Sequence, residues 1–327
     1  MKQLQDDHGW VCGMGFPGIN EEHGLGLLVT DGKAVHGFDI VVLKLIMHKK
    51  VADFMERAKE IGQKIVVDID DHFHGLSESN RAYEATDPEK NPEQNRDHYF
   101  SIIDNSDAII TSTPFLREFH EKRHEKVFMV RNGIDIGRWS RRRDCGGKTP
   151  TVGWVGATPW RSNDLESIAP FFGSVLKKNR MKFHHSGHTK NAPFAHEQLE
   201  LDPSICSVEG MSPILGYPKM FEKIDIGIVP LNDVPFNHAK SYIKGLEYAA
   251  AGVPFIASAA PEYSILAKGG VGRVAESPED WERHLSELAD PKVRAADVAK
   301  NLDNLPKFAM KKTGSDWNDT FSSILES

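Results

Sequence analysis

Cysteine is scarce in this sequence of 327 residues, which contains only Cys12, Cys145 and Cys206. The count is odd and the three positions are far apart, so they form neither a disulfide framework nor the paired spacing of a zinc site. A chain without these devices depends on its hydrophobic core, and free thiols suit a reducing compartment. We therefore predict a cytoplasmic protein.

Long apolar runs are missing as well. The longest uncharged stretch, residues 248–261, is too short to span a bilayer and is interrupted by Gly252 and Pro254. Residues 1–7 are not followed by the apolar segment of a signal peptide, so secretion is not expected. Positive charge is not in excess, since 47 acidic against 40 basic residues give a formal net charge of −7. Composition therefore offers no general attraction to nucleic acid, although a local basic patch stays open.

What the sequence does contain is a regular alternation of strand and helix patterns. Residues 38–45 and 64–70 are apolar runs typical of buried parallel strands. Residues 48–61 between them have helical spacing and stop before Gly62, a residue type that often ends helices. Two further strands are predicted at residues 108–111 and 127–130.

A second series of elements follows a linker. Residues 141–150 combine charge, paired glycines and a proline, as linkers do, whereas residues 75–97 are polar and interrupted by prolines, which predicts a surface excursion. After the linker, strands are predicted at residues 151–157, 181–187, 205–208, 225–231, 254–259 and 272–275. Helices are predicted at residues 164–178, 213–223, 240–251, 261–268 and 278–288, with one last helix in the tail after residue 305.

This alternation predicts an α/β fold of two doubly wound, Rossmann-like domains that face a cleft. The expected domains are residues 1–133 and residues 134–304, with a C-terminal helix at residues 305–327 packing back on the first domain. In such sheets ligands bind at the carboxyl ends of the strands. The architecture therefore favours an enzyme with its site at those ends.

The most informative segment runs from residue 230 to residue 258 as a strand, a loop, a helix and a strand. The expected helix start near Lys240 and Ser241 would attract an anion such as a diphosphate, because its N–H groups are free and the helix dipole is positive there. Lys244, one turn after Lys240, adds a second cation to the same face. Glu247 inside the helix could accept hydrogen bonds from two adjacent sugar hydroxyls, or could simply pair with one of the two lysines.

This segment resembles the donor-binding signature of the family-four retaining glycosyltransferases and their GT-B relatives, in the glycogen phosphorylase/glycosyltransferase superfamily. That signature is a helix with a glutamate, followed by Ala-Gly-x-Pro-x-Ile, which stands here at residues 251–256. The resemblance covers much of residues 130–276, including Arg131-Asn-Gly-Ile-Asp and the strand with its loop at residues 152–161. It implies a GT-B fold, a nucleotide diphosphate sugar as donor, retention of anomeric configuration, and a ribose-binding role for Glu247.

The sequence departs from that signature at one position. The family usually has a second glutamate eight residues before the ribose-binding one, and this position is Ala239. By the resemblance, Asn237, His238 and Lys240 would then contact the transferred sugar. A catalytically weak module that only binds sugar nucleotides is an alternative that this departure leaves open.

Two other loops are donor-site candidates. Gly156 would let the backbone approach a phosphate, and Arg161 would bind two phosphate oxygens and stabilise the leaving group, the alternative being a surface arginine. Gly210 and Met211, in the position of the family's base-binding loop, would read the nucleobase through their backbone groups, although this segment also reads as an ordinary helix-capping turn. His188 could lie near the phosphates.

Acidic and histidine residues gather at the end of the strand predicted at 64–70. By similarity to GT-B enzymes this edge binds the acceptor, with Asp71 and His72 catalytic and Asp70 and His74 in contact with the acceptor. Two rival interpretations use Asp68 and Asp70 with a metal ion. Asp-x-Asp is the metal motif of GT-A glycosyltransferases. The strand that ends in Asp-Ile-Asp, followed by Ile109-Ile-Thr-Ser-Thr, also resembles the first two motifs of haloacid-dehalogenase-type phosphatases.

Residues 13–18 match the pattern G-x-G-x-x-G, with Gly13 and Gly15 as its first glycines. The match is weak evidence for a dinucleotide site, because Pro17 interrupts the turn and no acidic residue ends the next predicted strand. We interpret it as the first loop of the N-terminal domain, on the acceptor side.

The sequence as a whole favours a glycosyltransferase that moves a sugar from a nucleotide diphosphate sugar to an acceptor. The acceptor is open: a glycan, a protein, a lipid or a modified nucleic acid. Fixed cations and amides would neutralise the diphosphate, so neither a metal ion nor a cofactor is expected.

Overall fold

The structure is a computed structural model that describes residues 1–20, 22–28, 34–87, 89–139, 149–161 and 163–326. Most of the predicted linker, residues 141–148, lies outside the described residues. Contacts divide the chain into two compact units. The first unit comprises Met1–Phe73, Tyr83–Arg131 and Met310–Ser327, and the second comprises His74–Ala82 and Asn132–Ala309. The second unit thus includes a short piece of the predicted surface excursion.

The first unit is built on a four-stranded parallel sheet with the strand order β4-β5-β6-β7. The strands are β4 (Ile40–Lys44), β5 (Lys64–Ile69), β6 (Ala108–Thr111) and β7 (Val127–Met129), and the helices between them are α2 (Lys49–Glu60), α3 (Asn95–Asp104) and α4 (Pro114–Glu121). All four predicted strands are present. Helix α2 forms where the apolar spacing predicted it, buries Val51, Phe54, Met55 and Ala58, and is followed by Gly62 in a left-handed conformation (φ 82°).

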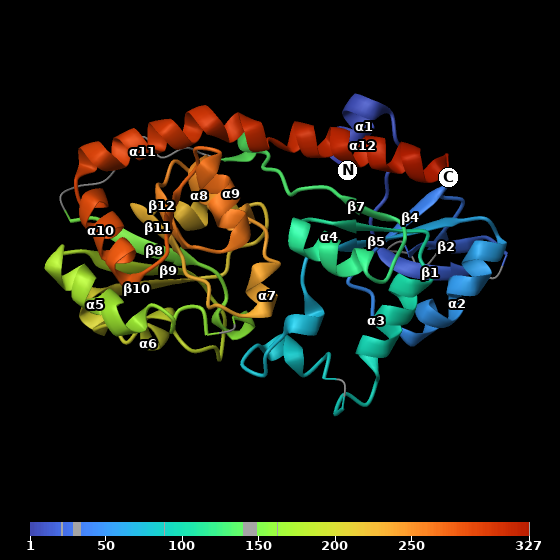
Figure 1. Ribbon diagram of the computed structural model, residues 1–327, viewed down its shortest axis with the longest axis horizontal. Coiled ribbons are helices and arrows are strands. Elements are labelled where there is room, and N and C mark those ends of the chain that lie inside the picture. Colours follow the sequence, from blue (N-terminus) through green and yellow to red (C-terminus); the bar gives the residue numbers. More distant parts are fainter. Residues whose placement is uncertain (21, 29–33, 88, 140–148, 162, 327) are drawn as a thin grey trace. The chain divides into compact units, whose positions relative to one another are not determined.

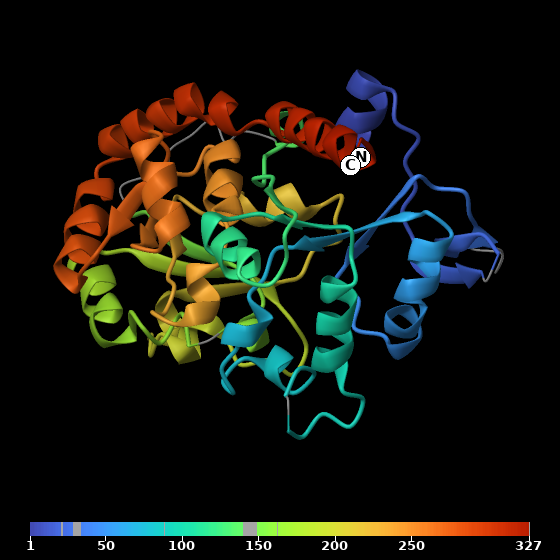
Figure 2. The same cartoon turned by 45° about the vertical axis from the view of Figure 1, so that its right-hand side comes forward.

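Two helices from the ends of the chain pack on the same sheet. Leu4 of α1 (Lys2–His8) and Phe321 and Ile324 of α12 (Met310–Leu325) form a buried cluster with strand residues such as Val66 and Ile110. The two helices lie side by side in both views (Figures 1 and 2). The monotonic strand order places successive right-handed crossovers on one face of the sheet, so the other face needs this cover from the chain ends.

A small antiparallel sheet completes the first unit, and the sequence did not predict it. Its strands are β1 (Phe16–Asn20), β2 (Gly24–Leu28) and β3 (Ala34–Val35). Gln63 anchors this sheet to the start of β5, because its amide accepts from Leu25 N at 2.7 Å and donates to Leu25 O at 2.8 Å. Such a two-way bond mimics one step of a sheet ladder.

The second unit contains a six-stranded parallel sheet with the order β10-β9-β8-β11-β12-β13. Its strands are β8 (Thr151–Val155), β9 (Lys182–His188), β10 (Cys206–Gly210), β11 (Ile226–Val229), β12 (Phe255–Ser258) and β13 (Arg273–Ala275). The chain begins in the middle, at β8, winds outward to β10, and then returns to β11 on the other side. The strand order therefore reverses between β8 and β11, as it does in dinucleotide-binding Rossmann sheets.

Helices cover both faces of this sheet (Figure 1). Helices α5 (Ala169–Lys178) and α10 (Pro278–Leu288) cover one face, and α8 (Ile243–Ala250) and α9 (Pro261–Lys268) cover the other. The remaining helices of this unit among the described residues are α6 (Ala195–Gln198), α7 (Pro235–His238) and α11 (Pro291–Asn304). The sequence predicted none of these three helices. The prediction of a helix at residues 213–223 is wrong, because only a 3-10 turn, η6 (Tyr217–Phe221), forms there. Pro218 explains this, since it cannot donate a helical hydrogen bond and disfavours helix before it.

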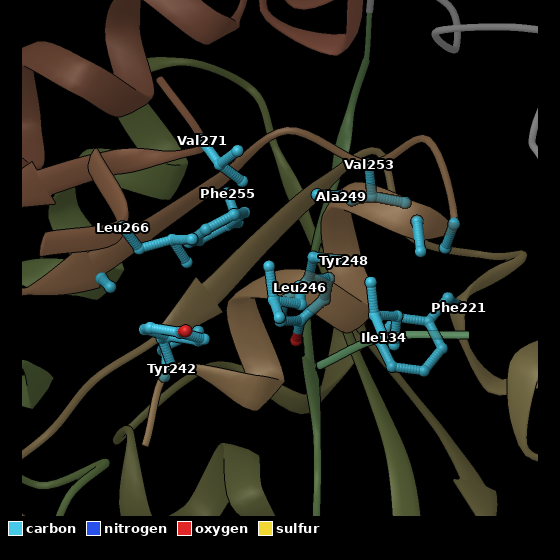
Figure 3. Packing of buried hydrophobic residues seen from close by; sticks show 14 of the residues in the cluster. Ile134, Phe221, Tyr242, Leu246, Tyr248, Ala249, Val253, Phe255, Leu266 and Val271 are labelled. Carbon is cyan, nitrogen blue, oxygen red and sulfur yellow. The ribbon is translucent and has the colours of Figure 1, made fainter. Parts of the chain in front are cut away.

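Tyr248 of α8 secures the point where β8 and β11 separate. Its ring lies against Gly227 of β11, where an added Cβ would come within 2.5 Å of the ring. Its hydroxyl accepts from Val155 N and donates to Gly153 O, each at 3.1 Å. Gly153 is the last residue of β8 that pairs with β11, and Val155 lies beyond it. Figure 3 shows Tyr248 with Leu246 and Phe255 in the buried cluster of this face. No helix within the described residues combines the length and apolar character needed to cross a bilayer.

Candidate functional site

The strand reversal of the second unit fixes where a ligand would bind. In open α/β sheets the crevice lies outside the carboxyl ends of the two strands that flank the reversal. Here those ends lead into residues 156–161 after β8 and residues 230–238 after β11. Helix α8, which carries Glu247, follows the second of these loops. Most of the predicted donor residues lie in these two loops and this helix.

Glu247 forms a cluster with Lys244 and Tyr217. Lys244 Nζ lies 2.7 Å from Glu247 Oε2, and the Tyr217 hydroxyl donates to the same oxygen at 2.8 Å. Lys244 also donates to the Tyr217 hydroxyl, which closes the triangle. The Lys244 and Glu247 side chains are 22% and 15% exposed, so the pair is largely buried rather than solvated. Glu247 was expected either to bind sugar hydroxyls or to pair with a lysine, and the structure contains the ion pair with Lys244. A ligand would therefore have to bind the other carboxylate oxygen, Oε1.

Burial governs the ionisation of this cluster. It lowers the pKa of Lys244, an effect that the Glu247 carboxylate opposes and the nearby charge of Arg161 reinforces. Burial also raises the pKa of Tyr217, and the negative charge of Glu247 raises it further. Tyr217 is consequently a neutral hydrogen-bond donor at physiological pH. The positive charge of Arg161 lowers the pKa of both Lys244 and Tyr217.

Arg161 is held beside the loop after β8. Its guanidinium carbon lies 5.6 Å from the ring centroid of Trp154, and its Nε is buried without a hydrogen-bond partner within the described structure. An added Cβ at Gly156 would come within 2.9 Å of Arg161 Nη2, so the glycine makes room for the guanidinium. Arg161 Nε is therefore a buried donor without a partner in the described structure, and its role towards phosphate stays a prediction.

His185 of β9 contacts the loop after β8 through the backbone of Gly156. The residue is fully buried, and its Nε2 lies 2.9 Å from Gly156 O. A carbonyl only accepts, so Nε2 carries the proton. Burial lowers the pKa of His185 to about 4, which keeps the ring neutral at pH 7. The predicted His188 stands at the strand end, 6.1 Å from the His185 ring and stacked on Phe194 at 4.3 Å.

The loop after β11 is anchored by a residue that the sequence did not single out. Asp164 is 1% exposed, and its Oδ1 accepts from Asn232 N at 3.0 Å and from Asn237 Nδ2 at 2.6 Å. Asn237 Nδ2 also donates to Asn232 O at 2.9 Å, while Asn237 Oδ1 is buried without a partner in the described structure. The amide group of Asn237 is thus committed to the loop, and only its oxygen is left to contact a sugar. No motif around Asp164 indicates this role.

The residues just before α8 have defined contacts of their own. His238 Nε2 lies 2.6 Å from Asp233 Oδ1 on an exposed surface. Lys240 Nζ lies 4.2 Å from the Phe236 ring centroid, and Ser241 Oγ accepts from Asn132 Nδ2 at 2.9 Å. Helix α8 begins at Ile243, so Lys240 and Ser241 precede its first turn rather than starting it.

The predicted base-binding loop lies at the end of β10. Gly210 follows a shift in the pairing of β10 with β9, and Met211 N donates to His188 O at 3.2 Å. Met211 is 48% exposed, and Ile214 and Leu215, which the sequence analysis did not select, are more exposed still. The loop offers backbone groups and apolar side chains together, as a surface for a flat ring would.

In the first unit, a lysine occupies the predicted acidic cluster. Lys44 Nζ lies 2.8 Å from Asp68 Oδ2 and 3.0 Å from Asp70 Oδ2. Burial raises the pKa of Asp68 in spite of Lys44. Burial alone would lower the pKa of Lys44, but the two carboxylates reverse this and raise it. Within the described residues, no three or more His, Cys, Asp or Glu side chains are placed to hold a metal ion.

The remaining predicted acceptor residues are dispersed. His72 is 6% exposed and packs edge-on against Phe115 and Phe119 of α4, at 5.2 and 4.6 Å between ring centroids. The charge of Asp71 reaches Tyr99, whose pKa burial and the nearby aspartates raise. His74 was predicted in the first domain, but it belongs to the second unit, because the chain leaves the first unit after Phe73.

Gly13 and Gly15 precede β1 of the antiparallel sheet and so do not follow a parallel strand as a ligand-binding loop would. An added Cβ at Gly13 would come within 2.6 Å of the Leu27 side chain, and one at Gly15 within 3.0 Å of Leu28 O. Close packing against β2 is therefore a sufficient reason for both glycines.

No model of a known protein family matches the chain. Solved structures nevertheless share its architecture, and the chain has the GT-B fold seen in glycosyltransferases. Sucrose-phosphate synthase from Thermosynechococcus elongatus superposes with a TM-score of 0.64 at 12% identity, over 89% of this chain and 75% of that one. The Anabaena protein Alr3699/HepE, solved in complex with UDP, gives a TM-score of 0.60 at 14% identity, over 88% of this chain and 79% of that one.

A particular relative emerges from the curated proteins. The chain is 26% identical over 179 residues to the Bacillus subtilis (strain 168) protein named "Putative teichuronic acid biosynthesis glycosyltransferase TuaH". The match covers 51% of this chain and 44% of TuaH, so the chain spans less than half the length of this relative.

Proposed function

We propose that this protein is a glycosyltransferase that moves a sugar from a nucleotide diphosphate sugar to an acceptor. The observation that carries the proposal is the placement of Glu247, Lys244 and Arg161 together beside the strand reversal of a Rossmann-type sheet. A carboxylate for a diol and a guanidinium for phosphate are the two groups that a nucleotide diphosphate needs. The UDP complex of a protein with the same fold supports this class of donor.

The residues divide the work as follows. Glu247 accepts hydrogen bonds from the ribose hydroxyls. Arg161, with Lys240 and the N–H groups at the start of α8, stabilises the negative charge that grows on the diphosphate as the sugar leaves. Lys244, which the sequence assigned to the diphosphate, acts mainly on Glu247, because its ammonium contacts that carboxylate directly. Fixed cations fill the role that a metal ion has in other transferases, so we propose a metal-independent reaction. Retention of configuration is proposed from the resemblance to the family-four enzymes.

We assign acceptor recognition to the first unit, around Asp70 and Asp71 at the end of β5. Lys44 holds one oxygen of Asp70, and the Asp70 side chain is 43% exposed, so it remains accessible to an acceptor hydroxyl. Similarity to a relative named for teichuronic acid biosynthesis favours a glycan among the four acceptor classes.

A second candidate is a module that binds sugar nucleotides with little transfer activity. Ala239, the position of the missing family glutamate, is fully buried. No carboxylate from this position reaches the sugar, and Asn237 Oδ1 is the acceptor that the adjoining loop offers in its place.

The experiment is calorimetric titration with UDP, GDP, ADP and their sugar conjugates. The wild-type protein should bind one nucleotide series, and Glu247→Gln should weaken that binding by ~1–3 kcal/mol, the range for a hydrogen bond to a charged group. Glu282→Gln is the matched control, because Glu282 is a half-exposed partner of Lys178 on the opposite face of the sheet. Binding that Glu247→Gln leaves unchanged would remove the basis of the proposal. Release of nucleotide diphosphate from the donor then separates a transferase from a binding module.

A further inference from the structure

Both contacts that the structure gives Glu247 fall on the same carboxylate oxygen. Lys244 Nζ and the Tyr217 hydroxyl meet at Oε2, and Oε1 has no hydrogen-bond partner among the described residues. Lys244 lies three residues before Glu247 on the same helix, so their pairing follows from helical geometry. Tyr217 lies 30 residues away on another element, so its contact depends on the tertiary fold.

The Tyr217 ring is held by its neighbours. The ring packs edge-on against Trp139 at 6.2 Å and Phe221 at 5.7 Å between ring centroids. The Lys244 ammonium lies 5.2 Å from the centroid of the Tyr217 ring. A ring fixed on these sides presents its hydroxyl in one direction. That hydroxyl is a neutral donor, and the only acceptor it has in the described structure is Glu247 Oε2.

When one carboxylate oxygen already accepts its hydrogen bonds from the protein, a ligand can donate only to the other oxygen. Oε2 receives two donors, which direct its lone pairs to Lys244 and Tyr217. Oε1 retains two lone pairs, enough for two neighbouring hydroxyl groups. A carboxylate free to rotate would instead share both oxygens between the lysine and the ligand, and would discriminate less between a diol and a single hydroxyl.

We propose that Tyr217 is a positioning residue that gives the donor pocket its selectivity for a ribose diol: together with Lys244 it pins Glu247 Oε2 and leaves Oε1 for the two ribose hydroxyls. This inference rests on the proposed function, since it concerns the same nucleotide. It goes further by naming a residue outside the sequence signature and the part of the ligand that this residue controls.

The test compares the nucleotide diphosphate that wild type binds with its 2′-deoxy form, by calorimetry. Tyr217→Phe keeps the ring and its packing and removes only the hydroxyl. Wild type should prefer the ribose form by about tenfold or more, the factor expected when one hydroxyl contact to a charged group is lost. Tyr217→Phe should weaken binding of the ribose form by about tenfold and of the deoxy form by about twofold, so the preference falls to about twofold.

Two controls make the outcome specific. Tyr83→Phe makes the same chemical change in the first unit and should leave both affinities unaltered. In the Glu247→Gln background, Tyr217→Phe should have little further effect, because the pinned oxygen is no longer charged. An unchanged ribose preference in a folded Tyr217→Phe protein overturns the inference while the proposed function stands. If wild type binds no nucleotide at all, the proposed function fails first.

Discussion

The anchoring of the loop after β11 by Asp164 gives a sharp prediction. Asp164→Ala removes a carboxylate that is 1% exposed and that accepts from the Asn232 amide and the Asn237 side chain. Residues 230–238 would lose the contact that fixes them to the segment just before α5. We expect both a less stable second unit and a weakened donor site, although Asp164 is not among the residues proposed to contact the donor.

The magnitude follows from the hydrogen bonds. A hydrogen bond to a charged acceptor contributes ~1.5–3 kcal/mol, so two such bonds set the upper range. Asn237 Nδ2 keeps its second acceptor, Asn232 O, which reduces the loss at that bond. We therefore expect Asp164→Ala to lower the free energy of unfolding by ~2–4 kcal/mol, and Asp164→Asn by less, because it keeps the side-chain volume.

Urea denaturation and hydrogen exchange measure this effect. Unfolding of the second unit should shift to lower urea, and the amides of residues 230–238 should exchange faster than in wild type. Asp233→Ala is the control on the same loop, since Asp233 is 94% exposed and its pairing with His238 should contribute below ~0.5 kcal/mol. If Asp164→Ala and Asp233→Ala had equal effects on stability and exchange, the anchoring role of Asp164 would be refuted.

Two further predictions concern metal ions and pH. Transfer activity should survive EDTA, because Arg161 and Lys240 are proposed to neutralise the diphosphate, and loss in EDTA with rescue by Mg²⁺ or Mn²⁺ would favour the metal interpretation of Asp68 and Asp70. The pKa of His185 falls from its ordinary 6.5 to about 4 in the folded protein, so between these values the unfolded chain binds a proton that the folded one does not. The free energy of unfolding should therefore decrease as pH falls from 6.5 towards 4, by up to ~3 kcal/mol from this residue, and His185→Gln should flatten that slope. An equal slope in both proteins would show that His185 is not the group responsible.

The parallel sheets could be predicted because their signals are local. Each buried strand is a short apolar run, and several covering helices have their own spacing and their own stop, as α2 has at Gly62. Helices α3 and α4 were not predicted. Helices α9 and α10 begin and end where they were predicted, since Pro261 and Pro278 mark their first turns. The GT-B fold follows once two such series are recognised.

The antiparallel sheet and the turn at η6 lack such signals. Strand β1 contains Pro17, strand β2 has two glycines in five residues, and Gln63, which bonds to Leu25 of β2, lies 38 positions along the chain. At residues 213–223 the apolar spacing suggests a helix, but Pro218 limits the segment to a 3-10 turn. Local spacing therefore misleads where one proline or one long-range amide decides the structure.

In the candidate site too, residues with local sequence signals could be predicted, and residues that act through long-range contacts could not. Lys244 and Glu247 could be paired from the sequence alone, because three positions along a helix bring side chains together. Tyr217 and Asp164 could not be found, because each acts on a residue 30 or 73 positions away, through contacts that exist only once the sheet has formed. The sequence thus indicates which groups would touch a nucleotide. The fold determines their orientation, because Tyr217 leaves Oε1 of Glu247 without a partner and Asp164 leaves Asn237 with only its acceptor oxygen.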